Sequence, residues 1–456
     1  YGLMQPDSGN MKLGSENFRP SEPSKARQSG IAMVFQHFSL FDALNVAENI
    51  ALGMENPPKI NDLSQKIETV SKSYGLPLDP KRLVGQLSAG ERQRVEIIRC
   101  LLQNPKLLIM DEPTSVLTPN EVTTLFETLL RLKKEGKSIL YISHKLEEIR
   151  EICDFATILR NGEKVGSCTP KNTSAKKIGE MMVGKSFSSP SRKNRTFGEE
   201  LIKVSNLSVH SKDFFGTSLS NINFSVRVGE ILGIGGVAGN GQDEFLGALS
   251  GETKTSPKTI TLLDQHIGHL RPNQRRELGL RAAPEERLGH AAAPAMSLVE
   301  NTLMTSHSKD VIDKWGIINF KNISTKTSRI VSEFDVRTPT LDNTAASLSG
   351  GNLQKFVIGR EILEKPKVFV VNQPTWGVDA AAAAFIRQSI LNLASQQSAV
   401  IVISQDLDEL FEICDTFAVL TNGYMSRIYE LGHLSSEDVG LLMGGSDLDL
   451  DSHAET

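Results

Sequence analysis

Two neighbouring carboxylates at the end of an apolar run are the residues of this sequence best placed to do chemistry. Asp111 and Glu112 directly follow the run Leu107 to Met110. Carboxylate oxygens are ligands that Mg2+ prefers, and a carboxylate beside the metal can polarise an attacking water. The pattern predicts that Asp111 binds the metal, directly or through water, and that Glu112 is the general base.

Much of the chain consists of two copies of one sequence pattern. LSAGERQRVEIIRCLLQNPKLLIMDEPTSVLTP, from residue 87, aligns with LSGGNLQKFVIGREILEKPKVFVVNQPTWGVDA, from residue 348, at an offset of 261 that holds for about 95 residues. Upstream the offset is 249, as in the pair Gln36 and Glu285, so the second copy carries about 12 extra residues between Glu285 and Ser349. A repeat of this length predicts two similar domains.

The second copy replaces the two carboxylates by amides. Asn372 aligns with Asp111, and Gln373 aligns with Glu112. An amide forms hydrogen bonds but cannot accept a proton as a base, and loss of a general base typically costs about 100- to 10,000-fold in rate. The second copy is therefore predicted to be a poor catalyst.

Two further polar residues follow predicted strands of the first copy. Gln36 follows IAMVF and could reach the metal or the water, and His144 follows SILYIS and could hydrogen-bond a terminal phosphate. A structural role is the alternative for a lone histidine at a strand end. The second copy has Glu285 and Gln405 at these positions.

A glycine-rich turn in the second copy resembles a phosphate-binding loop. The run Ile231 to Ile234 leads into a turn whose glycines match GxxGxGK[ST], so backbone N–H groups could surround an anion at a helix N-terminus. Gln242 replaces the lysine and Asp243 the serine or threonine, so the loop lacks the ammonium that neutralises the outer phosphates. A turn without a ligand is the alternative. The matching glycines are Gly236, Gly239 and Gly241.

The equivalent loop of the first copy would lie 249 residues earlier, immediately upstream of Tyr1. We therefore expect the chain to be a fragment that begins after its first phosphate-binding loop, and to be inactive by itself.

Each copy also has a short Ser-Gly turn at the start of a predicted helix. Such a turn offers a hydroxyl and backbone amides to a phosphate, and a plain helix cap is the alternative. Its repetition beside the strand of Asp111 favours the ligand site. The residues are Ser88 and Gly90 in the first copy and Ser349, Gly350 and Gly351 in the second.

Short apolar strands alternate with helical patterns in each copy. LLIM (107–110) and SILYIS (138–143) are separated by EVTTLFETLLRLKKEG, which has apolar residues at helical spacing. This order predicts a parallel sheet covered by helices, with phosphate ligands at the carboxyl ends of the strands.

Composition excludes several classes of protein. The 456 residues carry a net charge of −4, so no global positive field favours nucleic acid, and no apolar run approaches the roughly 20 residues that span a bilayer. The four cysteines show neither zinc spacing nor a disulfide framework, which favours a reducing compartment.

The boundary between the copies is predicted near 185–198, where the sequence is polar, Ser-rich and basic. A solvated linker is favoured over a nucleic-acid patch for Lys185, Arg192, Lys193 and Arg195, because no aromatic residues accompany the charges. The predicted organisation is a first domain over 1–184, a linker over 185–198, a second domain over 199–445 and a flexible acidic tail over 446–456.

These segments together resemble the ATP-binding subunits of ABC transporters, specifically the tandem type of sugar and nucleoside importers, over nearly the entire chain. The resemblance implies an α/β fold with two tandem P-loop NTPase domains, each a mainly parallel sheet with helices and a helical subdomain that carries the signature turn. In its terms Gln36 resembles the Q-loop, Ser88 to Glu91 and Ser349 to Asn352 the signature turns, Asp111 and Glu112 the Walker B pair, Leu117 to Pro119 part of the D-loop, and His144 the switch histidine.

The resemblance also implies that the two domains pair head to tail around ATP and Mg2+. The competent site would combine Asp111, Glu112, Gln36 and His144 with Ser349, Gly350, Gly351 and an upstream lysine, and Asp111 and Gln36 would bind the metal. The degenerate site would combine Gly236 to Asp243, including Gln242, and Asn372, Gln373 and Gln405 with Ser88, Ala89 and Gly90, where Ala89 departs from the usual glycine.

The implied function is ATP hydrolysis that energises import, at the cytoplasmic face of the membrane. The implied partners are two membrane permease subunits and, indirectly, an extracytoplasmic solute-binding lipoprotein. Segments such as IAMVFQHFSLFDALNVAENIALG resemble nucleoside importers more than ribose or galactose importers. The alternatives are a soluble ABC ATPase that acts on ribosomes or DNA, and a catalytically inactive nucleotide-binding regulator.

Overall fold

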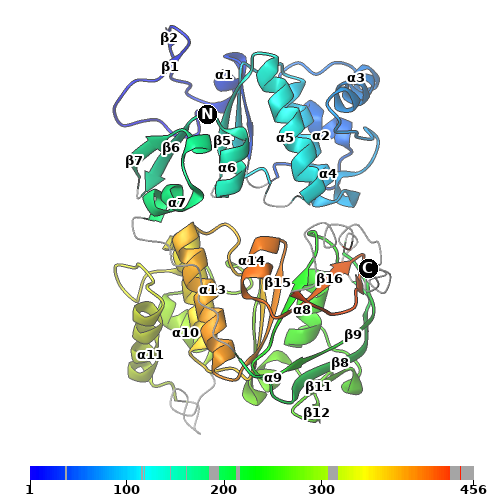
Figure 1. Cartoon of the computed structure of the whole chain (residues 1–456), viewed down its shortest axis with the longest axis vertical. Helices are drawn as coiled ribbons and strands as arrows, with labels where there is room; N and C mark the ends of the chain where they lie inside the picture. Colours follow the sequence, from blue (N-terminus) through cyan, green and yellow to red (C-terminus); the bar gives the residue numbers. More distant parts are fainter. Residues whose placement is uncertain are drawn as a thin grey trace. The chain divides into compact units, whose positions relative to one another are not determined.

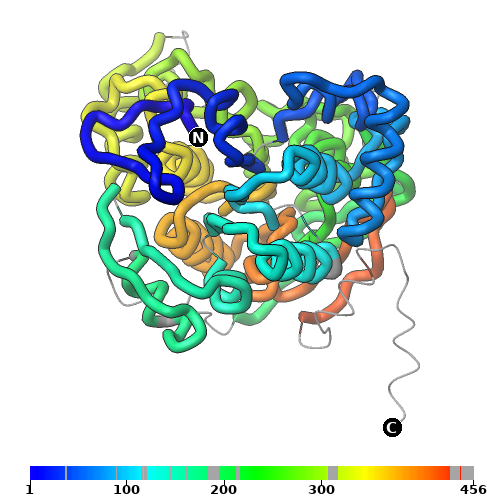
Figure 2. Tube along the Cα trace, turned by 90° about the horizontal axis from the view of Figure 1, so that it is seen from above, coloured from blue at the N-terminus to red at the C-terminus, as the bar shows by residue number. Residues whose placement is uncertain are grey.

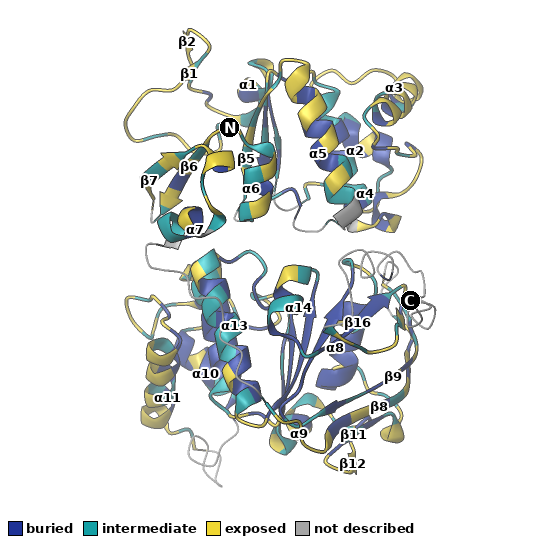
Figure 3. Cartoon of the chain, in the orientation of Figure 1, coloured by how far each residue is buried: buried dark blue, intermediate teal, exposed yellow. Residues whose placement is uncertain are grey.

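The computed structural model divides the chain into two compact units, residues 1–187 and 188–456 (Figure 1; Figure 2). Each unit has its own buried apolar core (Figure 3). None of the helices in the described part of the chain is long and apolar enough to cross a bilayer. The structure describes residues 1–35, 38–114, 117, 119–143, 145–160, 162–183, 195–211, 216–306, 317–431 and 442.

A mainly parallel sheet forms the centre of the second unit, with the strand order β13-β14-β15-β10-β16. Every residue of β10, β14 and β15 is buried, because apolar side chains alternate between two cores on opposite faces of the sheet. The strands are β13 (Leu280–Ala283), β14 (Val368–Asn372), β15 (Ala399–Ser404), β10 (Ile231–Gly235) and β16 (Thr416–Thr421), and the short β17 (Tyr424–Met425) and β18 (Tyr429–Glu430) pair antiparallel with β16.

Helices and a second sheet surround this centre. A four-stranded antiparallel sheet has the order β12-β11-β8-β9, and α10, α11 and α12 pack together as a helical layer. The helices are α8 (Gln242–Ser250), α9 (Pro272–Leu278), α10 (Leu298–Thr305), α11 (Phe320–Glu333), α12 (Gly350–Ile362), α13 (Ala380–Ser395) and α14 (Leu407–Ile413), and the strands are β8 (Glu200–Val209), β9 (Leu219–Arg227), β11 (Ile260–Leu262) and β12 (Gln265–His266).

The first unit repeats part of this plan. Its parallel sheet has the order β3-β4-β5, and β6 and β7 form a separate antiparallel pair. The strands are β1 (Lys12–Leu13), β2 (Glu16–Asn17), β3 (Ile31–Val34), β4 (Leu107–Asp111), β5 (Ser138–Ile142), β6 (Ala156–Arg160) and β7 (Glu163–Cys168). The helices are α1 (Pro23–Gln28), α2 (Val46–Leu52), α3 (Ile60–Ser73), α4 (Ala89–Leu101), α5 (Pro119–Lys134), α6 (Leu146–Ile152) and α7 (Ala175–Val183).

The elements of the two units recur at the offsets found in the sequence. β3 and β13 begin 249 residues apart, and α4 and α12 begin 261 residues apart. In between, the offset is 252 for α2 and α10 and 260 for α3 and α11. Most of the extra residues of the second copy therefore lie between α10 and α11.

The strand β5 lies at an open edge of its sheet. Its counterpart β15 pairs with both β14 and β10 and is fully buried, whereas β5 pairs with β4 alone among the described residues. Consequently Leu140 and Ile142 are 50% and 43% exposed. No described residue of the first unit fills the place that β10, the strand before the glycine-rich turn, has in the second.

The expectation of a solvated basic linker is wrong for Arg195. Its Nη2 forms an ion pair with both carboxylate oxygens of Asp415, at 2.8 and 2.7 Å, and its side chain is only 7% exposed. Asp415 also accepts a hydrogen bond from the backbone N–H of Ile231. Arg195 is thus bound to the second unit near the start of β10, while Lys185, Arg192 and Lys193 lie outside the described residues.

Candidate nucleotide-binding sites

The glycine-rich turn of the second unit connects β10 to α8, as the sequence predicts. Gly239 and Gly241 have φ angles of 85° and 107°, and Gly241 is the N-cap of α8. These left-handed conformations favour glycine, since a Cβ would strain them. Gly236 has no room for a side chain, because a Cβ there would lie 2.5 Å from the carbonyl oxygen of Leu420. The turn therefore has the backbone shape of a phosphate-binding loop.

Gln242, at the lysine position, closes this loop on itself. Its Nε2 donates to the carbonyl of Val237 at 2.8 Å, and its Oε1 accepts from the backbone N–H of Asn240 at 3.0 Å. The side chain is buried, so both ends of the amide are used inside the turn. The sequence predicts the missing ammonium but not this closure, which removes the Asn240 N–H from the groups available to an anion.

In the second site the carboxylate lies on the helix α8, and an amide lies at the end of the strand β14. Asp243 begins α8 where a hydroxyl residue is usual, and Asn372 ends β14 where the first unit has Asp111. Nδ2 of Asn372 donates to Oδ1 of Asp243 at 3.3 Å. Asn372 is fully buried, and its Oδ1 has no hydrogen-bond partner among the described residues.

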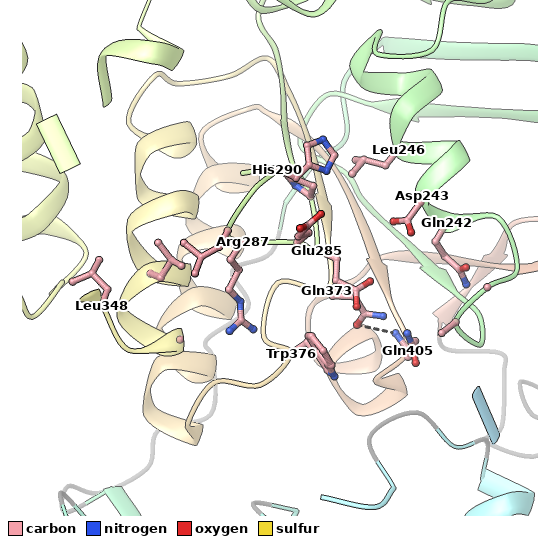
Figure 4. Close-up of a pocket in the computed structure, with 17 residues that line it drawn as sticks. Gln242, Asp243, Leu246, Glu285, Arg287, His290, Leu348, Gln373, Trp376 and Gln405 are labelled. Carbon is pink, nitrogen blue, oxygen red and sulfur yellow. Dashed lines mark hydrogen bonds between the residues drawn. The ribbon is translucent and has the colours of Figure 1, made fainter. Parts of the chain in front are cut away.

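A cavity of about 780 Å³ adjoins the loop of the second unit (Figure 4). Burial raises the pKa of Glu285 to about 7, and the charge of Asp243 adds to this effect, while Arg287 opposes it. Burial is also the main reason that the pKa of Asp243 is raised. The cavity thus holds carboxyl groups without the lysine that would favour a triphosphate. Residues that line it include Gln242, Asp243, Glu285, Arg287, Trp376 and Gln405.

Glu285→Gln is expected to stabilise the second unit in a pH-dependent way. Since the pKa of Glu285 is raised from 4.5 to about 7, the folded chain retains a proton that the unfolded chain releases, and stability falls as the pH rises through this window. Glutamine cannot ionise, so the variant should match the parent near pH 4 and be up to about 3 kcal/mol more stable above pH 7. Urea unfolding at both pH values measures this, and the exposed neighbour gives the control Glu286→Gln. An equal effect at both pH values would contradict the prediction.

The two strand ends predicted to carry the chemistry have the same backbone geometry. Glu112 and Gln373 both adopt a left-handed φ, 46° and 51°. The N–H of Glu112 donates to Ile142 on β5 at 2.9 Å, and that of Gln373 donates to Ile403 on β15 at 2.8 Å. Strained backbone of this kind is often found at functional sites, because the surrounding fold holds a side chain in place.

The structure brings together only part of each predicted site. In the second unit the backbone N–H of Gln405 donates to Oε1 of Gln373 at 3.4 Å, so these predicted partners are neighbours (Figure 4). In the first unit Asp111 and Glu112 lie at the carboxyl end of β4, whereas Gln36 and His144 lie outside the described residues. A single carboxylate such as Asp111 suits Mg2+, which is usually bound by one or two carboxylates together with substrate phosphates.

Both signature turns begin a helix, and their hydrogen bonds differ. Ser88 forms a reciprocal cap with Glu91, whose carboxylate accepts from the N–H of Ser88. In the second unit Asn352 replaces Glu91, and its Nδ2 donates to Oγ of Ser349 at 2.9 Å. Ser88 thus caps α4 with its side chain, whereas Ser349 forms no such bond among the described residues at the start of α12, where Gly350 and Gly351 are followed by Asn352.

Sequence reasoning missed Arg287 and Trp376, which line the cavity. The available signal was their difference from the aligned residues of the first copy, Phe38 and Ser115.

The arrangement of strands, glycine-rich turn and strand-end carboxylates defines a P-loop ATPase with two related domains. The family model for ABC transporters matches residues 1–115 and 219–376. The chain belongs to this family, as an ATP-binding protein of the tandem-domain type found in sugar and nucleoside importers.

Characterised relatives match nearly the whole chain. It is 36% identical over 453 residues to the nucleoside import ATP-binding protein NupA of Lactococcus lactis, covering 98% of this chain and 89% of that protein. It is 36% identical to the guanosine import ATP-binding protein NupO of Bacillus subtilis, with 98% and 88% covered. The ribose import ATP-binding protein RbsA of Geobacillus kaustophilus is 33% identical, with 96% and 88% covered.

Solved structures show the same fold at low identity. The archaeal ABCE1 in a ribosome-bound complex with Pelota has a TM-score of 0.62 at 19% identity, and covers 89% of this chain and 66% of that one. The α/β fold of tandem ABC ATPase domains is confirmed.

Proposed function

We propose that this chain is the ATP-binding and ATP-hydrolysing subunit of an importer for nucleosides or sugars, with one competent and one degenerate site. The observation that carries the proposal is the contrast between Glu112 and Gln373, which share a backbone geometry but not a titratable group. At this strand end, only the first copy offers a carboxylate that can accept a proton from water.

The competent site is proposed to use residues of both copies. Asp111 is positioned by β4 to hold Mg2+, which neutralises charge on the phosphates when bound. Glu112 then takes the proton of the attacking water, and Gln36 and His144 orient the water and the terminal phosphate. Ser349, Gly350 and Gly351 supply a hydroxyl and backbone amides to that phosphate from the second copy.

The degenerate site is proposed to act in closure rather than hydrolysis. Its loop is closed by Gln242, its strand end carries the amides of Asn372 and Gln373, and Glu285 adds a carboxyl group. These features support weaker triphosphate binding and no general base.

The transported solute and the partners are inferred from the relatives. Their names state nucleoside, guanosine and ribose import, which supports two permease subunits and an extracytoplasmic binding protein as partners, with the chain on the cytoplasmic face of the membrane. The test is ATP-dependent uptake of labelled guanosine and ribose in vesicles that contain the full-length protein and its permease subunits. We expect uptake of one solute class; ATP hydrolysis without uptake of either would contradict the importer.

A further inference from the structure

The surroundings of the two signature turns differ in charge. In the first unit Gly90 packs against the side chain of Glu121, which also forms an ion pair with Arg94 at 2.9 Å. In the second unit Ala382 occupies the position of Glu121, and the atoms nearest to where a Cβ on Gly351 would be are Oδ2 of Asp379 at 3.5 Å and Cβ of Ala382 at 3.6 Å. The carboxylates of Glu91 and Glu121 thus have no counterpart at the aligned positions, and the carboxylate of Asp379 beside the second turn caps α13 by accepting from the backbone N–H groups of Ala381 and Ala382.

An arginine also lies beside the second turn. Nη1 of Arg287 lies 2.9 Å from the position that a Cβ on Gly350 would have. The guanidinium carbon lies 6.0 Å from the ring centre of Trp376, within the range of a cation–π contact (Figure 4). Nη2 is buried and has no hydrogen-bond partner, and Arg287 forms no ion pair, within the described part of the chain. A buried guanidinium nitrogen without a partner is costly, unless a ligand provides one.

The two copies change together at the positions involved. Arg287 aligns with Phe38, and Gly350 aligns with Ala89. A methyl group on residue 350 would lie 2.9 Å from Nη1 of the guanidinium, so the end of the arginine side chain would have to move. The first copy has neither the arginine nor the glycine, so this close approach belongs to the second turn.

We propose that Arg287 is a phosphate-binding residue, which donates hydrogen bonds to the terminal phosphate of the ATP bound at the signature turn of the second copy. This inference rests on the proposed function, in which that turn belongs to the competent site. A guanidinium forms short, charge-assisted hydrogen bonds with phosphate oxygens. The contact with the ring of Trp376 helps to fix the orientation of the guanidinium plane.

The test measures ATP and ADP separately in the full-length protein. Arg287→Ala should lower kcat/KM for ATP by about 10- to 100-fold, the range for loss of one hydrogen bond to a charged group. The affinity for ADP should change less than about twofold, because ADP lacks the phosphate that the arginine binds. The matched control is Arg329→Ala on the surface of α11, where the arginine pairs with Glu333.

A second variant tests the same interaction in case Arg287→Ala does not fold. Gly350→Ala should displace the guanidinium and reproduce the selective loss for ATP, and the double variant should be no worse than either single variant, since both remove one interaction. Arg287→Lys should restore part of the loss. Equal weakening of ATP and ADP, or unchanged kinetics in both single variants, would overturn the role of Arg287. If instead the parent protein does not hydrolyse ATP, or Glu112→Gln leaves hydrolysis unchanged, the proposed function itself fails.

Discussion

Glu112→Gln in the full-length protein is expected to abolish ATP turnover and to leave ATP bound. Glutamine has nearly the same shape but cannot accept a proton, and loss of a general base costs about 100- to 10,000-fold. The second copy shows that this backbone accommodates the amide, because Gln373 has a φ of 51° where Glu112 has 46°. The fold should therefore survive the change, and only the proton transfer should be lost.

Two measurements separate these effects. Single-turnover hydrolysis of labelled ATP reports the chemical step, and the label retained after rapid desalting reports trapped nucleotide. Glu127→Gln is a matched control, since Glu127 is an exposed residue of α5 away from the strand end. Turnover within a few-fold of the parent in Glu112→Gln would reject Glu112 as the base.

The backbone plan of both units could be predicted from the repeat. The apolar runs 107–110 and 368–371 both form strands inside a parallel sheet, and the second of them is buried on both faces. In the sequence, the insertion in the second copy appears only as a change in the alignment offset. The positions of the helices show that most of it lies between α10 and α11. The parts of the fold that sequence periodicity determines were thus accessible without coordinates.

The candidate site was predictable in its residue types but not in its contacts. The exchange of Glu112 for Gln373 is visible by alignment, because it concerns one position. The closure of the loop by Gln242, the pairing of Arg195 with Asp415 and the approach of Arg287 to Gly350 depend on the folded path of distant segments. No local pattern encodes such distances.

The same limit applies to a buried network of charges beside the signature helix. Glu361 on α12 is fully buried and forms ion pairs with Arg360 at 3.0 Å, with Arg276 on α9 at 2.5 Å and with Arg281 on β13 at 3.7 Å. Burial alone would raise the pKa of Glu361, but the three arginines outweigh burial and hold the pKa below its ordinary value. The first copy has Cys100 at this position, so the network belongs to the second unit only.

Glu361→Gln is expected to destabilise the second unit by about 3 to 5 kcal/mol, because it leaves buried guanidinium groups without their common counter-charge. Urea unfolding of the full chain measures the loss, and the matched control is Glu333→Gln, in an exposed pair with Arg329 that should contribute less than about 0.5 kcal/mol. A loss below about 1 kcal/mol would mean that the arginines pair with other acidic groups. One such group is Glu364, whose carboxylate lies 3.2 Å from Arg281. Since the network joins α12 to β13, and β13 leads to Glu285 and Arg287, the variant should also weaken ATP binding at the turn that begins α12.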